Sequence, residues 1–246
     1  MRYQLYYWPT IQGRGEFIRL ALEDSGADYD DVARGTERNG MGLPAMMQLL
    51  ESNDLAQPPF APPFLKVGDQ IIGQTANILL FLGPRLGLAP KDEPNRLWAH
   101  QLQLTIADLV TEIHDTHHPV SGGLYYKDQK PEALRRAQDF TAARLPKFFG
   151  YFERILESNC ANSGSGDAYL LGDALSYVDL SMFQIIAGLR YAFPHTIKAL
   201  APTYPRLIAL HKRVALRPRI AAYLASSRHL PFNQQGIFRH YAELDG

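Results

Sequence analysis

The sequence predicts a chain in two parts, a mixed α/β N-terminal part followed by an all-α C-terminal part. Up to about residue 82, short runs typical of strands are interspersed with runs of helical period, and Gly68-Asp69 is a good hairpin turn. Gly83 to Asn95 is rich in proline and glycine, as interdomain linkers are. Beyond it, apolar residues recur with helical period. We therefore expect domains at residues 1–83 and 95–246, joined by a linker at residues 84–94.

The bulk composition argues against several classes of protein. The 246 residues carry 25 Lys and Arg and 25 Asp and Glu, so the formal charge is zero, and we expect no nucleic-acid partner. The longest apolar runs, such as Ile185–Leu189, are too short to cross a bilayer, so we expect no membrane partner. Cys160 is the single cysteine, which excludes an intrachain disulfide and a CxxC pair. Together with a start unlike a signal peptide, this predicts a cytoplasmic location.

The first element is a strand, loop and helix within Tyr3–Leu22. Tyrosines form the strand, Trp8-Pro9 ends it, and Glu16 opens the helix after a glycine-containing loop. Tyr7 stands at the end of the strand, where its hydroxyl can lie at the mouth of a cleft, and strand alternation turns Tyr6 to the opposite side. Tyr7 could also be an ordinary strand tyrosine, and Thr10 is the alternative hydroxyl.

Further strand and helix signals complete the N-terminal part. A helix is expected after Gln74, with Thr75 as its N-cap. Gly35–Pro59 is irregular, with a short helix around Ala45–Leu50. The further strands are expected at Ala27–Ala33, Phe64–Val67 and Gln70–Ile72.

The C-terminal part contains several helix signals. Ser176 and Asp179 stand three apart as the capping box of a helix that is apolar nearly all round, so this helix should be central and buried. Pro131 suits the first turn of an earlier helix, which Pro146 should kink, and Pro205 and Pro218 suit later helix starts. The expected buried stripes are Leu102, Ile106, Leu109 and Ile113, and then Leu134, Ala137, Leu145, Phe148, Phe152 and Leu156.

Several motifs follow one another along the chain: Tyr7-Trp8-Pro9 with Gly13-Arg14, Glu16–Arg19, Pro63–Leu65 eleven residues before Gln74-Thr75, and Gly172-Asp173 with Ser176 and Asp179. In this order and spacing they resemble the cytosolic glutathione transferases over nearly the whole chain. The tyrosine start is similar to the mu, pi, alpha and sigma side of that family. The resemblance implies a thioredoxin-like N-terminal domain, an all-helical C-terminal bundle and a homodimer. It also implies attack of the glutathione thiolate on an apolar electrophile, as in detoxification, with glutathione as co-substrate and no cofactor.

The implied chemistry needs a donor to the glutathione sulfur. A free thiol has a pKa near ~8.5, and lowering it to about 6.5 takes roughly 2.7 kcal/mol of preferential stabilisation of the anion. A hydrogen bond to a charged group contributes about 1.5 to 3 kcal/mol, so one donor nearly suffices. We assign this donor to the Tyr7 hydroxyl. A cation at Arg14 would favour the thiolate and lower the pKa of the phenol.

The resemblance also assigns the other glutathione contacts. Pro63 matches the family's cis-proline, although Pro62 could be the cis residue in another register. Pro62 offers a carbonyl but no N–H, so one of two usual backbone bonds to glutathione would be missing. Gln74 and Thr75 precede a helix whose N-terminus suits the γ-glutamyl carboxylate, and Asp108 would reach the γ-glutamyl ammonium across the dimer. The candidates for the glycyl carboxylate are Arg34, Arg38 and Gln57.

The resemblance places the electrophile pocket at Thr10, Ile11, His114 and His118. His118 would be a polar or acid group near the leaving atom. His114, His117 and His118 could also form a metal site, which Glu112 and Asp115 could complete, because i, i+4 spacing on a helix puts two imidazoles on one face. No HExxH pattern is present, and the resemblance places this segment at the electrophile pocket, so we assign no metal site.

Other functions of the same fold remain open from the sequence. A glutathione-dependent isomerase or peroxidase would use the same thiolate. A non-catalytic protein that binds glutathione or apolar ligands, or a structural protein, is the alternative of a different class.

Overall fold

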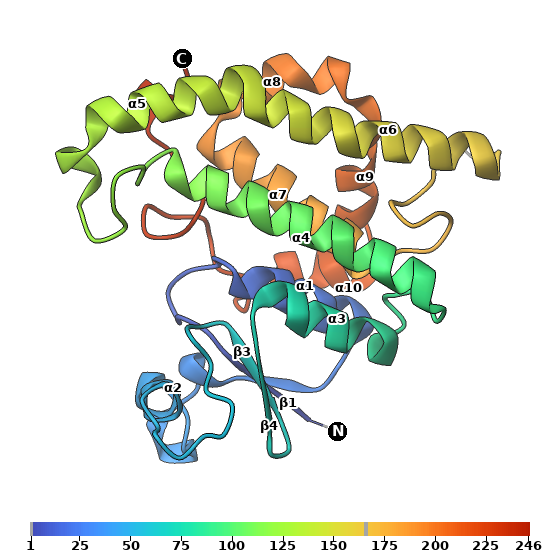
Figure 1. The fold of residues 1–246 in the computed structure, drawn as a ribbon. Helices are drawn as coiled ribbons and strands as arrows, with labels where there is room; N and C mark the ends of the chain where they lie inside the picture. The colour runs from blue at the N-terminus through green and yellow to red at the C-terminus, as the bar shows by residue number, and fades with distance from the viewer. Residues whose placement is uncertain (1, 165–166) are drawn as a thin grey trace. The chain divides into compact units, whose positions relative to one another are not determined.

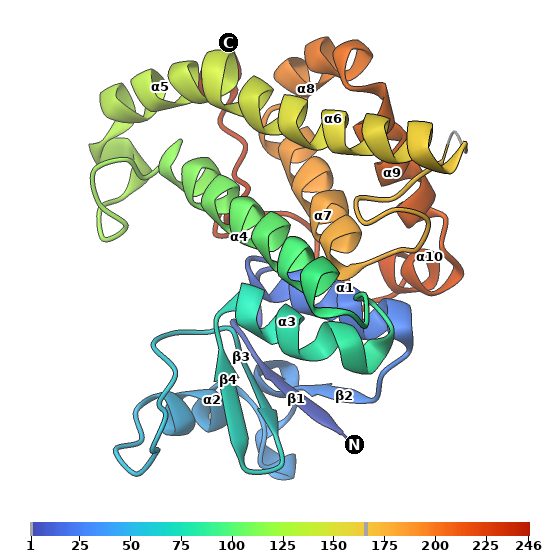
Figure 2. The ribbon, with the colours of Figure 1, turned by 45° about the vertical axis from the view of Figure 1, so that its right-hand side comes forward.

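The computed structural model describes residues 2–164 and 167–246, which form two compact units (Figures 1 and 2). Unit 1 contains the residues up to His100 together with Arg217–Pro231. Unit 2 contains Gln101–Leu216 and Phe232–Gly246. Over the described residues, no helix combines the length and the apolar character that a membrane crossing requires.

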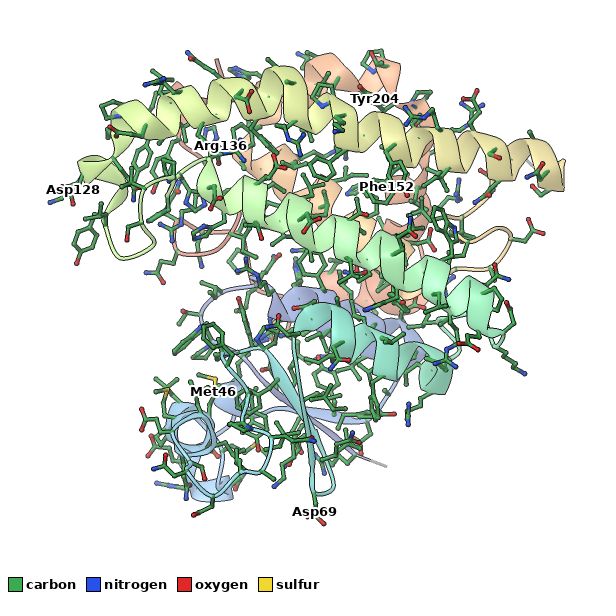
Figure 3. The ribbon with its side chains drawn as sticks, in the orientation of Figure 1. Met46, Asp69, Asp128, Arg136, Phe152 and Tyr204 are labelled. Atoms are coloured by element: carbon green, nitrogen blue, oxygen red, sulfur yellow. The ribbon has the colours of Figure 1, made fainter. Side chains whose placement is uncertain are left out.

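Unit 1 is built on a four-stranded sheet with the strand order β2-β1-β3-β4. β1 runs parallel to β2 and antiparallel to β3, and β3 and β4 form the expected hairpin. Asp69 lies at the tip of this hairpin (Figure 3). All four strands fall where the sequence predicted them: β1 at Tyr3–Tyr6, β2 at Tyr29–Asp31, β3 at Phe64–Val67 and β4 at Gln70–Gly73.

Side chains of a strand alternate between the two faces of the sheet. Apolar side chains on both faces pack against helices. On one face, Leu5 packs with Ile18 of α1 and with apolar residues of α3. On the other face, the rings of Tyr6 and Phe64 stack at 4.7 Å and pack with Met46 of α2. Figure 1 shows α1 and α3 on one side of the sheet and α2 on the other. The helices of unit 1 are α1 Gly15–Ser25, α2 Leu43–Leu50, α3 Thr75–Leu86 and α10 Pro218–Leu224, with 3-10 turns at Val32–Arg34 and Glu37–Asn39.

The start of α3 differs from the sequence prediction. Gln74, not Thr75, is the N-cap, with φ of 68° and ψ of 122°, and no side chain caps the helix. Thr75 is already helical, and its hydroxyl donates instead to the carbonyl of Arg14 at 3.5 Å. α3 also continues through Gly83 and Pro84 until Gly87, in the left-handed conformation, ends it.

Unit 2 is helical. The predicted stripe Leu102, Ile106, Leu109 and Ile113 on α4 is confirmed, because all four side chains are fully buried. Its helices are α4 Glu93–Asp115, which starts in unit 1, α5 Lys130–Asp139, α6 Leu145–Ser163, α7 Tyr177–Ala192, α8 Pro194–Leu200 and α9 Pro205–Ala215, with 3-10 turns at Tyr126–Asp128, Ala201–Thr203 and Ala242–Leu244.

A π-helical turn at Phe140–Arg144 joins α5 to α6, directly before Pro146. A π turn inserts an extra residue, so the buried face upstream of it shifts by one position. This explains why the predicted burial of Leu134 is wrong: Leu134 is 39% exposed, whereas Ala133 is fully buried. The other residues of the predicted stripe are buried as expected.

α7 begins with the predicted capping box and is buried almost all round. Asp179 Oδ2 accepts hydrogen bonds from the Ser176 N–H at 2.8 Å and from the Ser176 hydroxyl at 2.6 Å, and its Oδ1 accepts the Leu170 N–H at 2.8 Å. Burial raises the pKa of Asp179 to about 6, although these donors act in the opposite direction. The cap therefore ties the preceding loop to the central helix of unit 2.

Replacement of Ser176 should destabilise the fold. Ser176→Ala removes one N-cap side chain and should lower the free energy of unfolding by about 1 to 2 kcal/mol. Ser158→Ala, on the exposed face of α6, is the matched control and should change it by less than about 0.5 kcal/mol. Urea denaturation followed by circular dichroism measures both, and equal effects of the two variants would contradict this role of the cap.

Candidate functional site

Tyr7 follows directly after β1, and its side chain is only 4% exposed. Its hydroxyl oxygen accepts a hydrogen bond from the Arg14 N–H at 2.8 Å. Because the oxygen is the acceptor in this bond, the hydroxyl hydrogen is not used by it and can be donated to a ligand. Tyr6 lies in the core against α2, so the predicted separation of the two tyrosines is confirmed.

Two glycines let the loop close around the ring of Tyr7. A Cβ atom on Gly13 would lie 2.0 Å from the Tyr7 hydroxyl oxygen, and one on Gly15 would lie 2.6 Å from ring carbons. Gly13 also has a φ of +45°, which favours glycine. The close approach fixes the position of the hydroxyl.

The pKa of Tyr7 is raised above its ordinary value, because burial disfavours the phenolate. The Arg14 N–H and the charges of Arg14 and Arg19 act in the opposite direction, but they are smaller effects. Arg14 therefore lowers the pKa of the phenol as expected, but desolvation outweighs this effect and the net pKa is raised. As a result the phenol keeps its proton at neutral pH, and this protonated form is the hydrogen-bond donor.

Arg14 connects Tyr7 to the start of α3. Its N–H donates to Tyr7, and its carbonyl accepts the Thr75 hydroxyl at 3.5 Å. Three of the predicted site residues therefore lie in one chain of hydrogen bonds. The N-terminus of the 12-residue helix α3, which carries partial positive charge, lies beside this loop and suits an anionic group.

Gln74 has an unusual backbone conformation at this point. Gln74 is the one non-glycine residue with a positive φ among the described residues. Such a conformation costs on the order of 1 to 3 kcal/mol and is often found at functional sites. The sequence did not predict this strain, because glutamine has no preference for a positive φ.

The peptide bond between Pro62 and Pro63 is cis. This confirms the register in which Pro63 is the cis residue and excludes the other one. Pro63 is buried and Pro62 is half-buried directly before β3, and Pro62 can offer only its carbonyl.

A buried charge network next to Tyr7 was missed by the sequence analysis. Arg19 is fully buried, and its guanidinium carbon lies 5.8 Å from the centroid of the Tyr7 ring. Its Nε–H donates to Asp31 at 2.7 Å, and Nη1 donates to Glu16 and to the Gln12 carbonyl, each at 3.3 Å. The only sequence signal was the i, i+3 spacing of two charges on an apolar helix.

The network also includes α10. The Tyr223 hydroxyl donates to Glu16 at 2.8 Å, across 207 residues of sequence. Burial and the charge of Glu16 raise the pKa of this phenol, so Tyr223 remains a donor. α10 therefore helps to hold the residues that position the Tyr7 loop.

The three candidates for the glycyl carboxylate differ in their surroundings. Arg34 lines a cavity of about 330 Å³ in unit 1, where its guanidinium lies 3.5 Å from the Asp31 carboxylate and donates to the Arg228 carbonyl. Arg38 and Gln57 are exposed. Their roles stay predictions.

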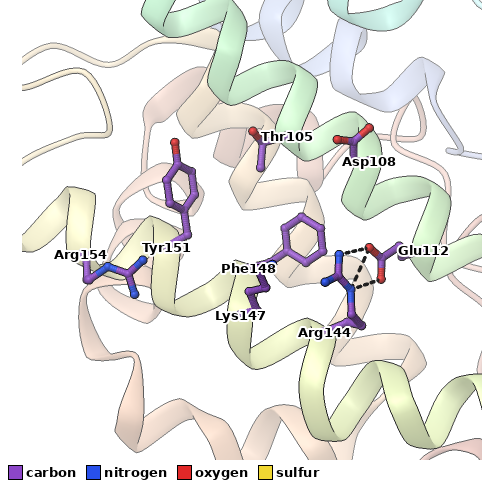
Figure 4. Close-up of a pocket in the computed structure, with 8 residues that line it drawn as sticks. All are labelled: Thr105, Asp108, Glu112, Arg144, Lys147, Phe148, Tyr151 and Arg154. Carbon is purple, nitrogen blue, oxygen red and sulfur yellow. Dashed lines mark hydrogen bonds and ion pairs between the residues drawn. The ribbon is translucent and has the colours of Figure 1, made fainter.

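Asp108 is exposed on α4 and lines a pocket of about 440 Å³ with residues of α6 (Figure 4). Glu112, one turn further along α4, is paired with Arg144 at 2.6 Å and with Arg136 at 3.3 Å, and hydrogen bonding from Arg144 lowers the pKa of Glu112. Figure 4 shows no ion pair between Asp108 and the other residues drawn. Its role across a dimer stays a prediction.

His118 is held neutral at pH 7. Burial, with a smaller effect from Arg239, lowers its pKa to about 4. It can offer a neutral N–H, but it cannot serve as the cationic acid that the sequence analysis allowed. Thr10 and Ile11 belong to unit 1, whereas His114 and His118 belong to unit 2, and the electrophile pocket assigned to them stays a prediction.

Comparison with known proteins finds similarity to glutathione S-transferases. Residues 114–227 match the family model described as glutathione S-transferase, C-terminal domain. The chain is 25% identical over 225 residues to a glutathione S-transferase of Plasmodium falciparum, covering 91% of this chain and 95% of that relative. It is 26% identical over 238 residues to glutathione S-transferase P of Bos taurus, covering 95% of this chain and 98% of the relative.

A solved structure has the same fold. The pi-class glutathione S-transferase of Onchocerca volvulus matches with a TM-score of 0.69 and 24% identity, covering 96% of this chain and 99% of that chain. The predicted fold class, a thioredoxin-like N-terminal part followed by a helical C-terminal part, is confirmed.

The enclosure of Tyr7 makes Gly15 sensitive to substitution. Gly15→Ala places a methyl group against the Tyr7 ring and should lower the free energy of unfolding by about 1 to 3 kcal/mol, as overpacking does. Gly122→Ala is the matched control, because a Cβ there meets nothing within 4 Å. Urea denaturation compares the two variants, and a fully stable Gly15→Ala would show that the loop does not clamp the ring.

Proposed function

We propose, from its similarity to glutathione S-transferases over nearly its full length, that the chain is a cytosolic glutathione S-transferase that transfers glutathione to an apolar electrophile. The observation that carries the proposal is the buried Tyr7 hydroxyl, whose oxygen accepts the Arg14 N–H. The remaining hydroxyl hydrogen is donated to the glutathione sulfur. One such bond to an anion contributes about 1.5 to 3 kcal/mol, close to the roughly 2.7 kcal/mol needed.

The other glutathione contacts are proposed from the residues around this donor. The Pro62 carbonyl accepts from the cysteinyl N–H, and Gln74 and Thr75 hold the γ-glutamyl carboxylate at the N-terminus of α3. Arg14 adds positive charge beside the sulfur. Asp108 of a second subunit binds the γ-glutamyl ammonium.

We also propose that the protein is a cytoplasmic homodimer. Several large apolar side chains are exposed in the single chain, and a second copy would remove them from water. They include Phe60 at 92%, Leu97 at 61% and Leu104 at 47%. Light scattering of the purified chain measures the mass, and a monomer at micromolar concentration would contradict the dimer.

A non-catalytic glutathione-binding protein is the second candidate, favoured by one observation. Pro62 lacks the N–H that would complete the pair of backbone bonds to glutathione. Retention on immobilised glutathione followed by a conjugation assay with an aryl halide separates the two functions. Retention without conjugation would support binding alone. Isomerase or peroxidase activity would use the same thiolate and needs its own substrates.

Removal of the Tyr7 hydroxyl should weaken catalysis at neutral pH. Tyr7→Phe should raise the pKa of enzyme-bound glutathione and lower kcat/KM by roughly 10- to 100-fold, the equivalent of one charged hydrogen bond. The loss should shrink above pH ~8.5, where the thiol ionises without help. The measurements are the ultraviolet absorbance of bound thiolate and kcat/KM against pH.

Tyr6→Phe is the matched control for this prediction. Tyr6 lies in the core against α2, so its replacement should leave the pKa of bound glutathione unchanged. If Tyr7→Phe and the native chain give the same thiolate pKa, Tyr7 is not the donor.

A backbone donor at position 62 should improve glutathione binding. Pro62→Ala restores the missing N–H, and a neutral hydrogen bond of about 0.5 to 1.5 kcal/mol corresponds to a roughly 2- to 12-fold lower Kd. Calorimetry with glutathione measures this, with Pro58→Ala in the exposed loop as the control. Equal or weaker binding by Pro62→Ala, with the fold intact, would contradict the predicted contact.

A further inference from the structure

Three imidazoles converge in unit 2 at the C-terminal end of α4. His114, His117 and His118 each offer one ring nitrogen, and these nitrogens lie within 4.8 Å of one another. The ring centroids are 4.7 to 5.5 Å apart. From the sequence, these three histidines were considered as metal ligands, but no metal site was assigned to them.

Hydrogen bonds fix the tautomers of two of these rings. His117 Nε2 lies 2.8 Å from the Ile237 carbonyl, which only accepts, so Nε2 carries the hydrogen and Nδ1 carries the lone pair. His114 Nδ1 lies 3.3 Å from the Asp115 carboxylate, which accepts its hydrogen, so Nε2 would be the metal-binding nitrogen of the neutral ring. Metal-binding histidines in proteins typically donate their second ring N–H in this way, to a carbonyl or a carboxylate.

Charged groups of both signs lie near the cluster. The positive charge of Arg239 opposes a bound cation, whereas the carboxylate of Asp115, 3.3 Å from His114 Nδ1, favours one. The side chain of His114 is 31% exposed, which provides access from solvent.

We propose that His114, His117 and His118 bind one divalent transition-metal ion, with water completing the coordination. Imidazole nitrogens suit Zn²⁺, Ni²⁺, Cu²⁺ and Co²⁺, and three protein ligands with one open position form a common zinc geometry. This inference does not rest on the proposed glutathione chemistry.

Binding requires the rings to move locally, because nitrogens that lie within 4.8 Å of one another must take up the ligand spacing of the ion. His117 Nδ1 and His118 Nδ1 lie 2.5 Å apart and share one hydrogen. Ligands of a tetrahedral Zn²⁺, each about 2.05 Å from the metal, lie roughly 3.3 Å from one another. The two rings therefore move apart by a fraction of an ångström, and the shared hydrogen passes to the other nitrogen of His118.

Direct metal titration tests the proposal. The full chain is prepared without a polyhistidine tag, stripped with a chelator and kept free of glutathione, which itself binds metals. Co²⁺ is added and the visible absorption recorded, and Zn²⁺ binding is measured by calorimetry. We expect one ion per chain, a cobalt spectrum typical of nitrogen ligands in a tetrahedral site, and displacement of Co²⁺ by Zn²⁺.

Histidine variants locate the site. His114→Asn should weaken Zn²⁺ binding more than about tenfold, whereas His195→Asn, at an 82% exposed side chain, should not change it. His117 is nearly fully buried, so His118→Asn is the second variant, with circular dichroism to verify folding. The proposal is overturned if the native chain binds no stoichiometric Co²⁺ or Zn²⁺, or if His114→Asn and His118→Asn bind as tightly as the native chain.

Discussion

The hydrogen bond from the Arg14 N–H to the Tyr7 hydroxyl oxygen is the interaction on which the proposed site depends. It uses the oxygen as an acceptor and so directs the hydroxyl hydrogen elsewhere. The ring cannot turn away without moving the loop, because Gly13 and Gly15 close tightly around it. Burial keeps the phenol protonated. The protein thus presents a neutral donor at a fixed point, and this is what a thiolate requires.

A network of buried charged residues also holds the loop that encloses Tyr7. Arg19 pairs with Asp31 and Glu16 and donates to the Gln12 carbonyl, and Tyr223 completes the network. A buried ion pair adds little net stability, but the loss of one partner costs about 3 to 5 kcal/mol because it leaves an unpaired charge. The position of the loop is therefore sensitive to the loss of any one partner of the network.

Features set by nearby residues could be predicted from the sequence, and features set by distant contacts could not. Tyr7 and the capping box at Ser176 follow from the order of strand, break, loop and cap, and the structure confirms both positions. Glu16 meets its Tyr223 partner only through folding across 207 residues.

Local backbone changes also escaped the sequence analysis. The extra residue of the π turn at Phe140–Arg144 shifted the buried face, which exposed Leu134. The positive φ of Gln74 has no signature in its residue type.

A crystal structure with glutathione bound tests the central claim most directly. The account predicts that the sulfur lies at hydrogen-bonding distance from the Tyr7 hydroxyl while the Arg14 N–H still binds that oxygen. A sulfur held by the Thr10 hydroxyl, or by any group other than Tyr7, would contradict it.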